Sequence, residues 1–183
     1  MWQIDHTKIL SRGEITKVLV RAKGQNRIIF RLACTGLRVS EICDLAATHV
    51  HVGQDHPYIQ IVNGKGGRNR RVPLWWDADA YRELADWRSA MPESRWHFVA
   101  TKHGTRLERW AVRKRFLSAC RCLGQDRQRT LTIHHGRHTF ISYALQAGRP
   151  LAAVRDAAGH ASLHTTSIYA HLTEDSGEMG SMY

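Results

Sequence analysis

The chain has 183 residues, 43% of them hydrophobic, which is enough for one domain with a real core. Its 27 lysines and arginines against 16 aspartates and glutamates give a net charge of +11, which favours a polyanion such as nucleic acid over a membrane surface or an acidic protein. No apolar run approaches the roughly 18 residues needed to cross a bilayer, and the first ten residues lack a signal-peptide pattern. A cytoplasmic protein without membrane contact is therefore expected.

The first part of the chain predicts three helices. Residues 11–22 begin with Ser11 and Glu14 at the spacing of a capping box, and their apolar residues then fall on one face. Residues 25–36 form a second helical pattern, which a glycine ends. Residues 38–46 restart a short helix, for which Ser40 is a candidate N-cap.

Between residues 48 and 74 the pattern changes to that of strands. Three short strand patterns are present, over residues 48–52, 58–62 and 70–74. The turn before the last strand is rich in glycine and basic residues, and Pro73 favours an edge position for that strand. We therefore expect a small three-stranded antiparallel sheet with a basic hairpin tip.

The remainder of the chain is predicted to be helical. Five helical segments are expected, over residues 77–91, 106–124, 133–148, 149–159 and 162–172. Asp77 is the expected N-cap of the first, and Gly159 follows the end of the fourth. Residues 173–183 carry three acidic residues and no basic one, and are expected to be a short tail. The fold class is therefore α+β and mostly helical.

The histidines and cysteines do not favour a metal site. The spacings of the four cysteines fit neither a zinc ribbon nor a redox pair, so reduced core thiols are expected. His134 and His138 are four residues apart, as in helical zinc sites, but no glutamate lies between them and Arg137 disfavours a bound cation. A histidine and an arginine suit a phosphate better, because arginine offers a bidentate fork and histidine exchanges protons near neutral pH.

Other polar residues stand in unusual surroundings. Arg38 lies between apolar segments, and a buried arginine needs an anionic partner, for which Glu41 is the candidate; a surface pair is the simpler alternative. Lys65 lies in the glycine-rich tip, where the backbone can approach a ligand, although taken alone it is an exposed lysine. Tyr169, nine residues after His160, is taken alone an ordinary tyrosine. A phenol becomes a useful nucleophile where cations stabilise its anion.

The order and spacing of these residues resemble the tyrosine recombinase family, which includes phage integrases and Xer-type recombinases and is related to type IB topoisomerases. TGLRVSEICDL resembles the family's first motif, HHGRHTF its His-x-x-Arg box and AAGH its Leu-Gly-His box. The resemblance implies the family's catalytic-domain fold over residues 1–172. The residues that it implies in catalysis are Arg38, Lys65, His134, Arg137, His160 and Tyr169, with Glu41 supporting the first arginine.

The resemblance also implies a reaction. Tyr169 would attack a DNA phosphodiester, forming a 3′-phosphotyrosyl bond and releasing a 5′-hydroxyl, and the 5′-hydroxyl of another strand would reverse the step. The two arginines would hold the non-bridging oxygens, His160 would hydrogen-bond the phosphate, His134 would assist proton transfer and Lys65 would protonate the leaving oxygen. No metal, ATP or other cofactor is required. The implied partner is double-stranded DNA, bound by a homo-tetramer that is monomeric when free.

The chain departs from the family pattern in three respects. Gly136 and Ala158 stand at packing positions where leucine is usual. The chain also begins almost at the catalytic domain, so the N-terminal domain with which relatives clamp DNA is expected to be absent, and the chain is either a fragment or a natural minimal form. Weak DNA binding and poor or absent recombination are expected of this chain alone. Basic residues expected to contact DNA are Arg68, Arg70, Arg71, Arg113 and Lys114.

Three other functions remain as alternatives: a DNA-binding remnant without catalysis, a relaxing topoisomerase with the same chemistry, and a histidine-bound metal hydrolase. The complete set of six residues favours an enzyme over a binding module, because binding needs no aligned tyrosine. Integration, excision, chromosome resolution and transposition use the same residues, and the target sequence is not encoded in any motif.

Overall fold

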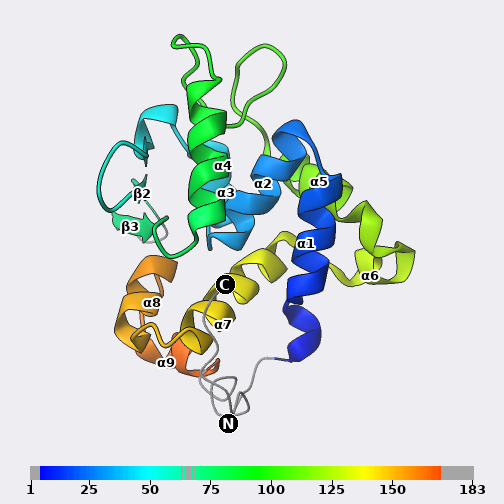
Figure 1. The fold of residues 1–183 in the computed structure, drawn as a ribbon, viewed down its shortest axis with the longest axis vertical. Coiled ribbons are helices and arrows are strands. Elements are labelled where there is room, and N and C mark those ends of the chain that lie inside the picture. Colours follow the sequence, from blue (N-terminus) through cyan, green and yellow to red (C-terminus); the bar gives the residue numbers. More distant parts are fainter. Residues whose placement is uncertain (1–4, 63, 65–66, 68, 170–183) are drawn as a thin grey trace.

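The computed structural model describes residues 5–62, 64, 67 and 69–169, and shows helices with one small sheet on their flank (Figure 1). The helices are α1 (Arg12–Arg21), α2 (Gly24–Cys34), α3 (Val39–Asp44), α4 (Ala78–Ser89), α5 (Arg109–Ala119), α6 (Gln125–Thr130), α7 (Ile133–Gln146), α8 (Leu151–Ala158) and α9 (Leu163–Ser167). Short 3-10 turns cover His6–Lys8, Ala47–His49 and Cys120–Leu123. The predicted mostly helical α+β class is confirmed.

The sheet has the predicted three antiparallel strands. They are β1 (Val50–His51), β2 (Tyr58–Ile61) and β3 (Arg70–Pro73), in the order β1-β2-β3. Ile59 lies opposite Val50 on one side and Val72 on the other, and all three are buried, so these three residues set the register. In the described residues β3 pairs only with β2, so the edge position predicted from Pro73 is confirmed.

The helix caps agree with the sequence in two places and differ in one. Ser11 and Glu14 form the predicted capping box, and Asp77 accepts a hydrogen bond from the Ala80 N–H at 2.9 Å. The prediction that Ser40 caps α3 is wrong, because Arg38 occupies that position. The Arg38 backbone N–H donates instead to the carboxylate of Glu41, at 2.7 Å, so the acidic residue satisfies the end of the helix.

Two segments differ from the expected helices. Residues 125–130, for which no element was predicted, form α6. The last helix was expected over 162–172, but α9 ends at Ser167 and Tyr169 lies in the turn that follows. Residues 170–172 and the predicted tail, 173–183, lie outside the described residues.

The core consists of two hydrophobic clusters. The larger cluster contains residues of the sheet and of all five helices from α1 to α5. Within it, Phe30 of α2 stacks on Phe116 of α5 at 5.7 Å between ring centroids. The smaller lies between α7, α8 and the turn after α9, and includes Trp76 and Tyr169. Among the described residues, no helix combines the length and the apolar character that a membrane crossing requires.

The departure at Gly136 has a structural reason. Helices α2 and α7 cross at this residue, and a Cβ built on it would stand 2.8 Å from the carbonyl carbon and from the Cβ of Ala33. Glycine therefore permits a closer crossing than leucine would. This contact places α7, which carries the predicted histidine and arginine, directly against α2.

Candidate active site

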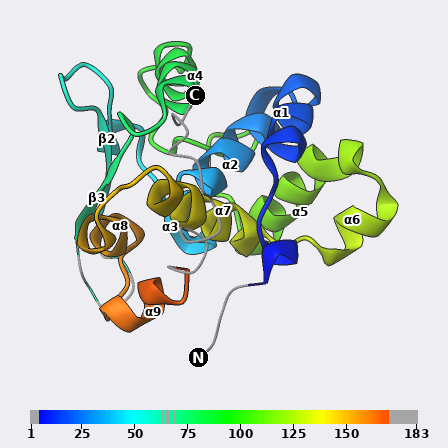
Figure 2. The ribbon, with the colours of Figure 1, turned by 60° about the horizontal axis from the view of Figure 1, so that its bottom comes forward.

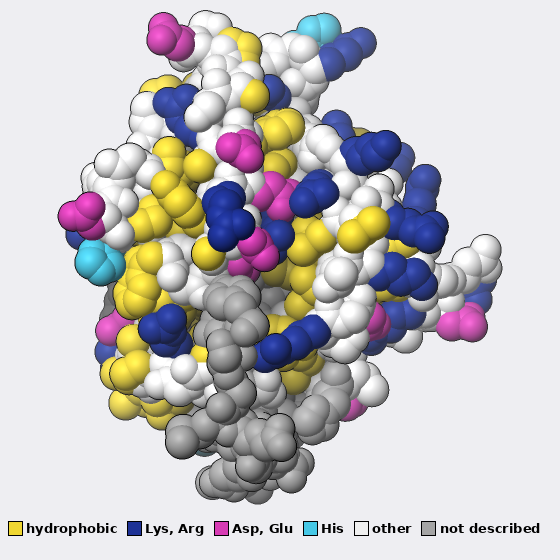
Figure 3. Space-filling model, viewed as in Figure 1, with side chains coloured by type: hydrophobic (Ala, Val, Ile, Leu, Met, Phe, Trp, Pro, Cys, Tyr) yellow, Lys and Arg dark blue, Asp and Glu magenta, His cyan; other side chains and the backbone are white. Residues whose placement is uncertain are grey.

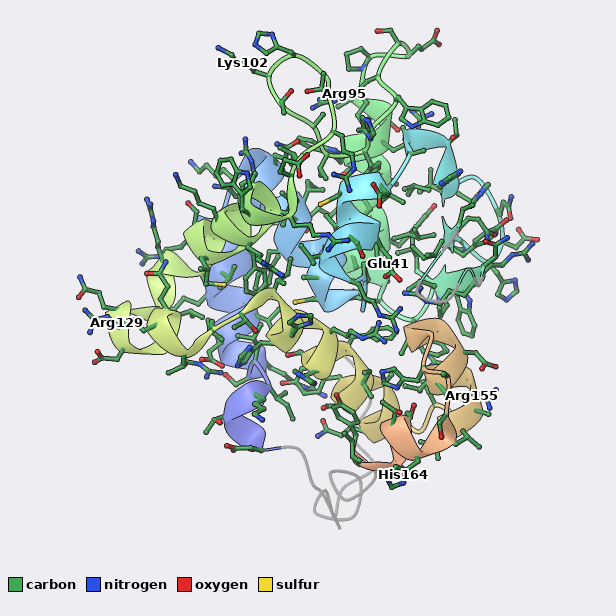
Figure 4. All side chains as sticks on the ribbon, turned by 180° about the vertical axis from the view of Figure 1, so that it is seen from behind. Glu41, Arg95, Lys102, Arg129, Arg155 and His164 are labelled. Atoms are coloured by element: carbon green, nitrogen blue, oxygen red, sulfur yellow. The ribbon has the colours of Figure 1, made fainter. Side chains whose placement is uncertain are left out.

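The predicted site residues come from segments far apart in the sequence that meet beside the end of α8. Figure 2 shows α8 and α9 lying beside α7, with β3 alongside α8. Seen from behind, Glu41 lies in the middle of the molecule, where α3 approaches α7 and α8 (Figure 4). The start of α3, strand β3, helix α7 and the end of α8 therefore surround one place.

Arg38 and Glu41 form the pair that the sequence suggested, inside the protein rather than on its surface. Nη1 of Arg38 donates to Oε1 of Glu41 at 2.9 Å, and the two side chains are 20% and 4% exposed. Burial would raise the pKa of Glu41, but hydrogen bonds and charge from Arg70, and then from Arg38, outweigh it and lower this pKa to about 2. Glu41 is thus a carboxylate at any ordinary pH.

Arg137 is buried and anchored to backbone on both sides. Its Nη1 donates to the carbonyl of Gly36 at 2.6 Å, and its Nη2 donates to the carbonyl of Ala158. Burial, followed by the charges of Arg38 and Arg70, lowers its pKa to about 9. Arg137 is still a cation at neutral pH, and an anion bound beside it would relieve the repulsion between these arginines.

The two predicted histidines lie in different surroundings. Nδ1 of His160 lies 2.8 Å from the hydroxyl of the buried Thr166, a contact that fixes the orientation of the ring. Burial and then the charge of Arg137 lower the pKa of His160 to about 4. His134 lies at the start of α7, where partial burial and then the charge of Arg113 lower its pKa. Both rings are expected to be neutral at pH 7.

Tyr169 is held by a histidine that the sequence did not assign to it. Its side chain is 3% exposed, and its hydroxyl lies 2.5 Å from Nδ1 of His138. Burial lowers the pKa of His138 to about 4, so the ring that shares this hydrogen bond with the phenol is neutral at pH 7. Burial also raises the pKa of Tyr169 to about 12, although the nearby charge of Arg137 works in the opposite direction.

An open hollow of about 640 Å³ lies beside Arg38. Glu41, Gly64 of the β2–β3 hairpin and Arg109 at the start of α5 also line it. The hairpin backbone therefore borders the same space as the first arginine. Lys65 and Arg68, the two predicted residues at the tip of that hairpin, lie outside the described residues.

The other residues predicted to contact DNA separate into two groups. Arg71, Arg113 and Lys114 are exposed, and Lys and Arg side chains gather on the side where α1, α5 and α6 lie (Figure 3). Arg70 instead points inward: its side chain is 9% exposed and its guanidinium binds Glu41 and the carbonyl of Ala157. This geometry does not support the predicted DNA contact of Arg70.

The structure thus brings most of the predicted site together. Arg38 and Arg137 bond to the end of α8, which leads directly into His160, Glu41 is paired with Arg38, and Tyr169 lies near Arg137. Sequence reasoning missed the roles of Arg70 and His138, because each depends on a contact between distant segments. It also missed Thr166, which is only six residues from His160 but reaches it across the turn between α8 and α9. Within the part of the chain that the structure describes, no three histidine, cysteine or carboxylate side chains gather as metal ligands would.

Comparison with known proteins gives concordant matches. Residues 10–176 match the model of the Phage integrase family. The tyrosine recombinase XerD of Brucella suis biovar 1 is 33% identical over 160 residues, covering 85% of this chain and 50% of that protein. The tyrosine recombinase XerC of Neisseria gonorrhoeae is 35% identical over 142 residues, covering 77% and 45%. The crystal structure of XerA recombinase superposes with a TM-score of 0.75 at 25% identity, covering 89% of this chain and 60% of that one. The chain spans about half the length of the curated relatives it matches.

Proposed function

Because the chain belongs to the Phage integrase family of tyrosine recombinases, we propose that it is the strand-cutting domain of a site-specific DNA recombinase or integrase. One observation carries the proposal: Arg38 and Arg137 are both bonded to the end of α8, beside His160, with Tyr169 buried nearby. Two buried or half-buried cations and a neutral histidine at one helix end suit a phosphodiester. A tyrosine beside them suits covalent chemistry on it.

In the proposed reaction Tyr169 Oη attacks a DNA phosphorus, the bond to the 5′-oxygen breaks, and a 3′-phosphotyrosyl ester forms. The phenol proton leaves to a base and the departing oxygen gains a proton to become a 5′-hydroxyl. The 5′-hydroxyl of another strand then reverses both steps. Because one ester replaces another each time, no nucleotide hydrolysis is needed.

Arg38 and Arg137 hold the non-bridging oxygens in this scheme, and Nε2 of His160 donates a hydrogen bond to the phosphate. His134 assists removal of the phenol proton, and Lys65 protonates the leaving 5′-oxygen. Binding of the phosphate would also bring negative charge beside Arg137, whose pKa burial and like charges now lower. The substrate thus stabilises the cations that activate it.

In this scheme Tyr169 starts from the position in which it contacts His138. Its hydroxyl is hydrogen-bonded to His138, and attack requires that this contact break so that the oxygen can reach the phosphorus of a phosphate whose oxygens the arginines bind. The raised pKa of Tyr169 makes this phenol harder to ionise than an ordinary tyrosine. This arrangement supports a nucleophile that is inert without DNA.

Double-stranded DNA is the proposed partner, with four copies acting on two duplexes and single copies in the absence of DNA. The net charge of +11 and the exposed basic residues of β3 and α5 support the DNA part of this proposal. The exposed arginines would follow the phosphate backbone, so affinity should fall steeply as salt rises.

The proposal is tested with a pool of duplexes that carry a randomised centre and a nick beside the expected cleavage position. After cleavage the short fragment diffuses away, so a covalent protein–DNA adduct accumulates and survives a denaturing gel. We expect an adduct in the presence of chelator and without ATP, and none with Tyr169→Phe. Sequencing the trapped strands reads the target.

Other outcomes of the same experiment point to the alternatives. An adduct that persists in Tyr169→Phe would remove this residue as the nucleophile. Sequence-independent adducts together with relaxation of a supercoiled plasmid would indicate a topoisomerase, and cleavage abolished by chelator would indicate a metal hydrolase. Tight DNA binding with no adduct would indicate a binding module.

A further inference from the structure

Three consecutive backbone carbonyls at the C-terminal end of α8 each accept a hydrogen bond from a different arginine. Arg70 Nε donates to Ala157 at 2.8 Å, Arg137 Nη2 donates to Ala158, and Arg38 Nη2 donates to Gly159 at 2.7 Å. The last carbonyls of a helix have no partner within the helix and carry its negative partial charge. The end of α8 therefore stabilises three arginine cations through the partial negative charge of its carbonyls, so each arginine does not need a carboxylate of its own.

The one carboxylate in this group is shared between two of the arginines. Arg70 binds both oxygens of Glu41, at 2.6 and 2.8 Å, while Arg38 reaches only Oε1 with its side chain, at 2.9 Å. All three guanidinium nitrogens of Arg70 are engaged in these contacts, and its side chain is 9% exposed against 20% for Arg38. Arg70 takes the larger share of the negative charge, which leaves Arg38 more available to an outside anion.

Close packing reinforces the position of Arg70. Its Cδ and Nε lie where a side chain at Gly159 would begin: a Cβ on that glycine would stand 2.8 Å from Cδ and 2.9 Å from Nε. Gly159 also has a φ of +68°, which a residue with a side chain rarely adopts. The guanidinium of Arg70 thus packs against Gly159, whose carbonyl orients Arg38 and whose peptide leads into His160.

We propose that Arg70 is a positioning residue of the strand-cutting site, which bridges Glu41 to the end of α8 and thereby orients Arg38 without touching DNA. This inference rests on the proposed function. If Arg70 is removed, Arg38 becomes the one arginine of this group that is paired with Glu41. Arg38 then turns toward the carboxylate, which offsets part of its positive charge. The carbonyl of Ala157 also loses its partner, and the end of α8 is released from β3.

The test separates DNA affinity from the cutting step. Arg70→Lys and Arg70→Gln are compared with wild type in single-turnover adduct formation at saturating protein, on the nicked duplex selected from the pool. We expect the rate to fall on the order of tenfold to a hundredfold, as small misplacements of reacting groups do. The Kd for DNA, from fluorescence anisotropy, should change by less than about threefold, because no phosphate contact is lost.

Substitutions of two other arginines serve as controls. Arg71→Gln alters the next residue of β3, which is exposed and stacks on Tyr58 with 4.5 Å from its guanidinium carbon to the ring centroid. It should weaken DNA binding and reduce the salt slope by about one phosphate contact. Arg82→Gln removes an arginine of α4 that is 70% exposed and paired with Asp79, and this variant should behave as wild type.

A readout that needs no catalysis is the titration of the Glu41 carboxyl, followed by NMR of the full chain with labelled glutamate. Its pKa should rise in Arg70→Gln, because the largest pairing partner is lost while burial stays. It should be unchanged in Arg71→Gln and Arg82→Gln. If Arg70→Gln does not fold, Gly159→Ala displaces the same guanidinium while keeping its charge, and should slow adduct formation in the same way.

The possible results are distinguishable. An Arg70 variant with a normal rate at saturating protein, weaker binding and a reduced salt slope would make Arg70 a phosphate contact and overturn the inference. An unshifted Glu41 titration in Arg70→Gln would overturn it as well, even if no adduct forms. The absence of adduct in wild type would instead refute the proposed function.

Discussion

The hydroxyl of Tyr169 is hydrogen-bonded to Nδ1 of His138 at 2.5 Å, and this contact joins the turn after α9 to the middle of α7. Both side chains are largely removed from solvent, so loss of either leaves the other with a buried polar atom that has lost a partner. In a double-mutant cycle of His138→Ala and Tyr169→Phe, followed by urea unfolding, we expect a coupling free energy of about 0.5–1.5 kcal/mol.

The cycle has an internal control. The hydroxyl of Tyr81 donates to the carbonyl of Val52 at 3.0 Å, far from α7 in the fold. Tyr81→Phe combined with His138→Ala should therefore be additive. Additivity of the His138 and Tyr169 substitutions would mean that the contact between them adds nothing to stability.

The buried histidines make the protein sensitive to mild acid. The pKa values of His138 and His160 are lowered to about 4, from 6.5, first of all by burial. Between pH 6.5 and 4 these two histidines are therefore protonated in the unfolded chain but neutral in the folded chain. The free energy of unfolding consequently falls as pH drops through this window. His160→Gln should flatten the curve, as measured by urea unfolding from pH 7 to 4. His164→Gln, on the exposed side of α9, should follow the wild-type curve.

Alanine is expected to have opposite effects at Gly136, where α2 and α7 cross closely, and at Gly13, which has open space beside it. Gly136→Ala places a Cβ 2.8 Å from the backbone of Ala33 and should destabilise the protein by about 1–3 kcal/mol. Gly13→Ala, within α1 and with no atom within 4 Å of the new Cβ, should be neutral or stabilise it by up to about 1 kcal/mol. Thermal and urea unfolding of the two variants measure both; a stable Gly136→Ala would mean that the two helices can separate cheaply.

Arg113 and Lys114 are adjacent on α5 but face different ways. Arg113 lies near enough to His134 to lower its pKa, whereas Lys114 lines a separate hollow with Trp110 and Arg121. If the DNA lies on the side of the histidine, Arg113→Gln should weaken binding and reduce the salt slope by about one, and Lys114→Gln should leave the slope unchanged. Anisotropy titrations at several salt concentrations measure both slopes. Equal loss in the two variants would place DNA across the whole helix.

Much of this structure was predictable because its signals are local. The capping box of Ser11 and Glu14, the alternation around Ile59 and the stop at Gly159 each depend on a few neighbouring residues, and each is confirmed. The pairing of Arg38 with Glu41 was predictable for the same reason, since they are one helical turn apart. The family motifs then supplied the order of the site.

What could not be predicted depends on contacts across the fold. Arg70 and Arg71 are neighbours in a strand, and only the position of α8 over one face decides that the first turns inward. His138 was considered only beside His134, because its contact with Tyr169 exists only when the chain after α9 folds back onto α7. Ser40 failed as a cap because α3 already begins at Val39, with Arg38 at the N-cap and its backbone N–H bonded to the carboxylate of Glu41.

The peptide of Gly36 links two arginines that are about a hundred residues apart in the chain. Its carbonyl receives Nη1 of Arg137, and two residues later the backbone reaches Arg38. A rotation of this single peptide would withdraw a support from one arginine while changing the direction in which the other leaves the chain. The stretch from Gly36 to Arg38 therefore couples the positions of the two positive charges, and a substitution beside this peptide would change how a phosphate is held without replacing either arginine.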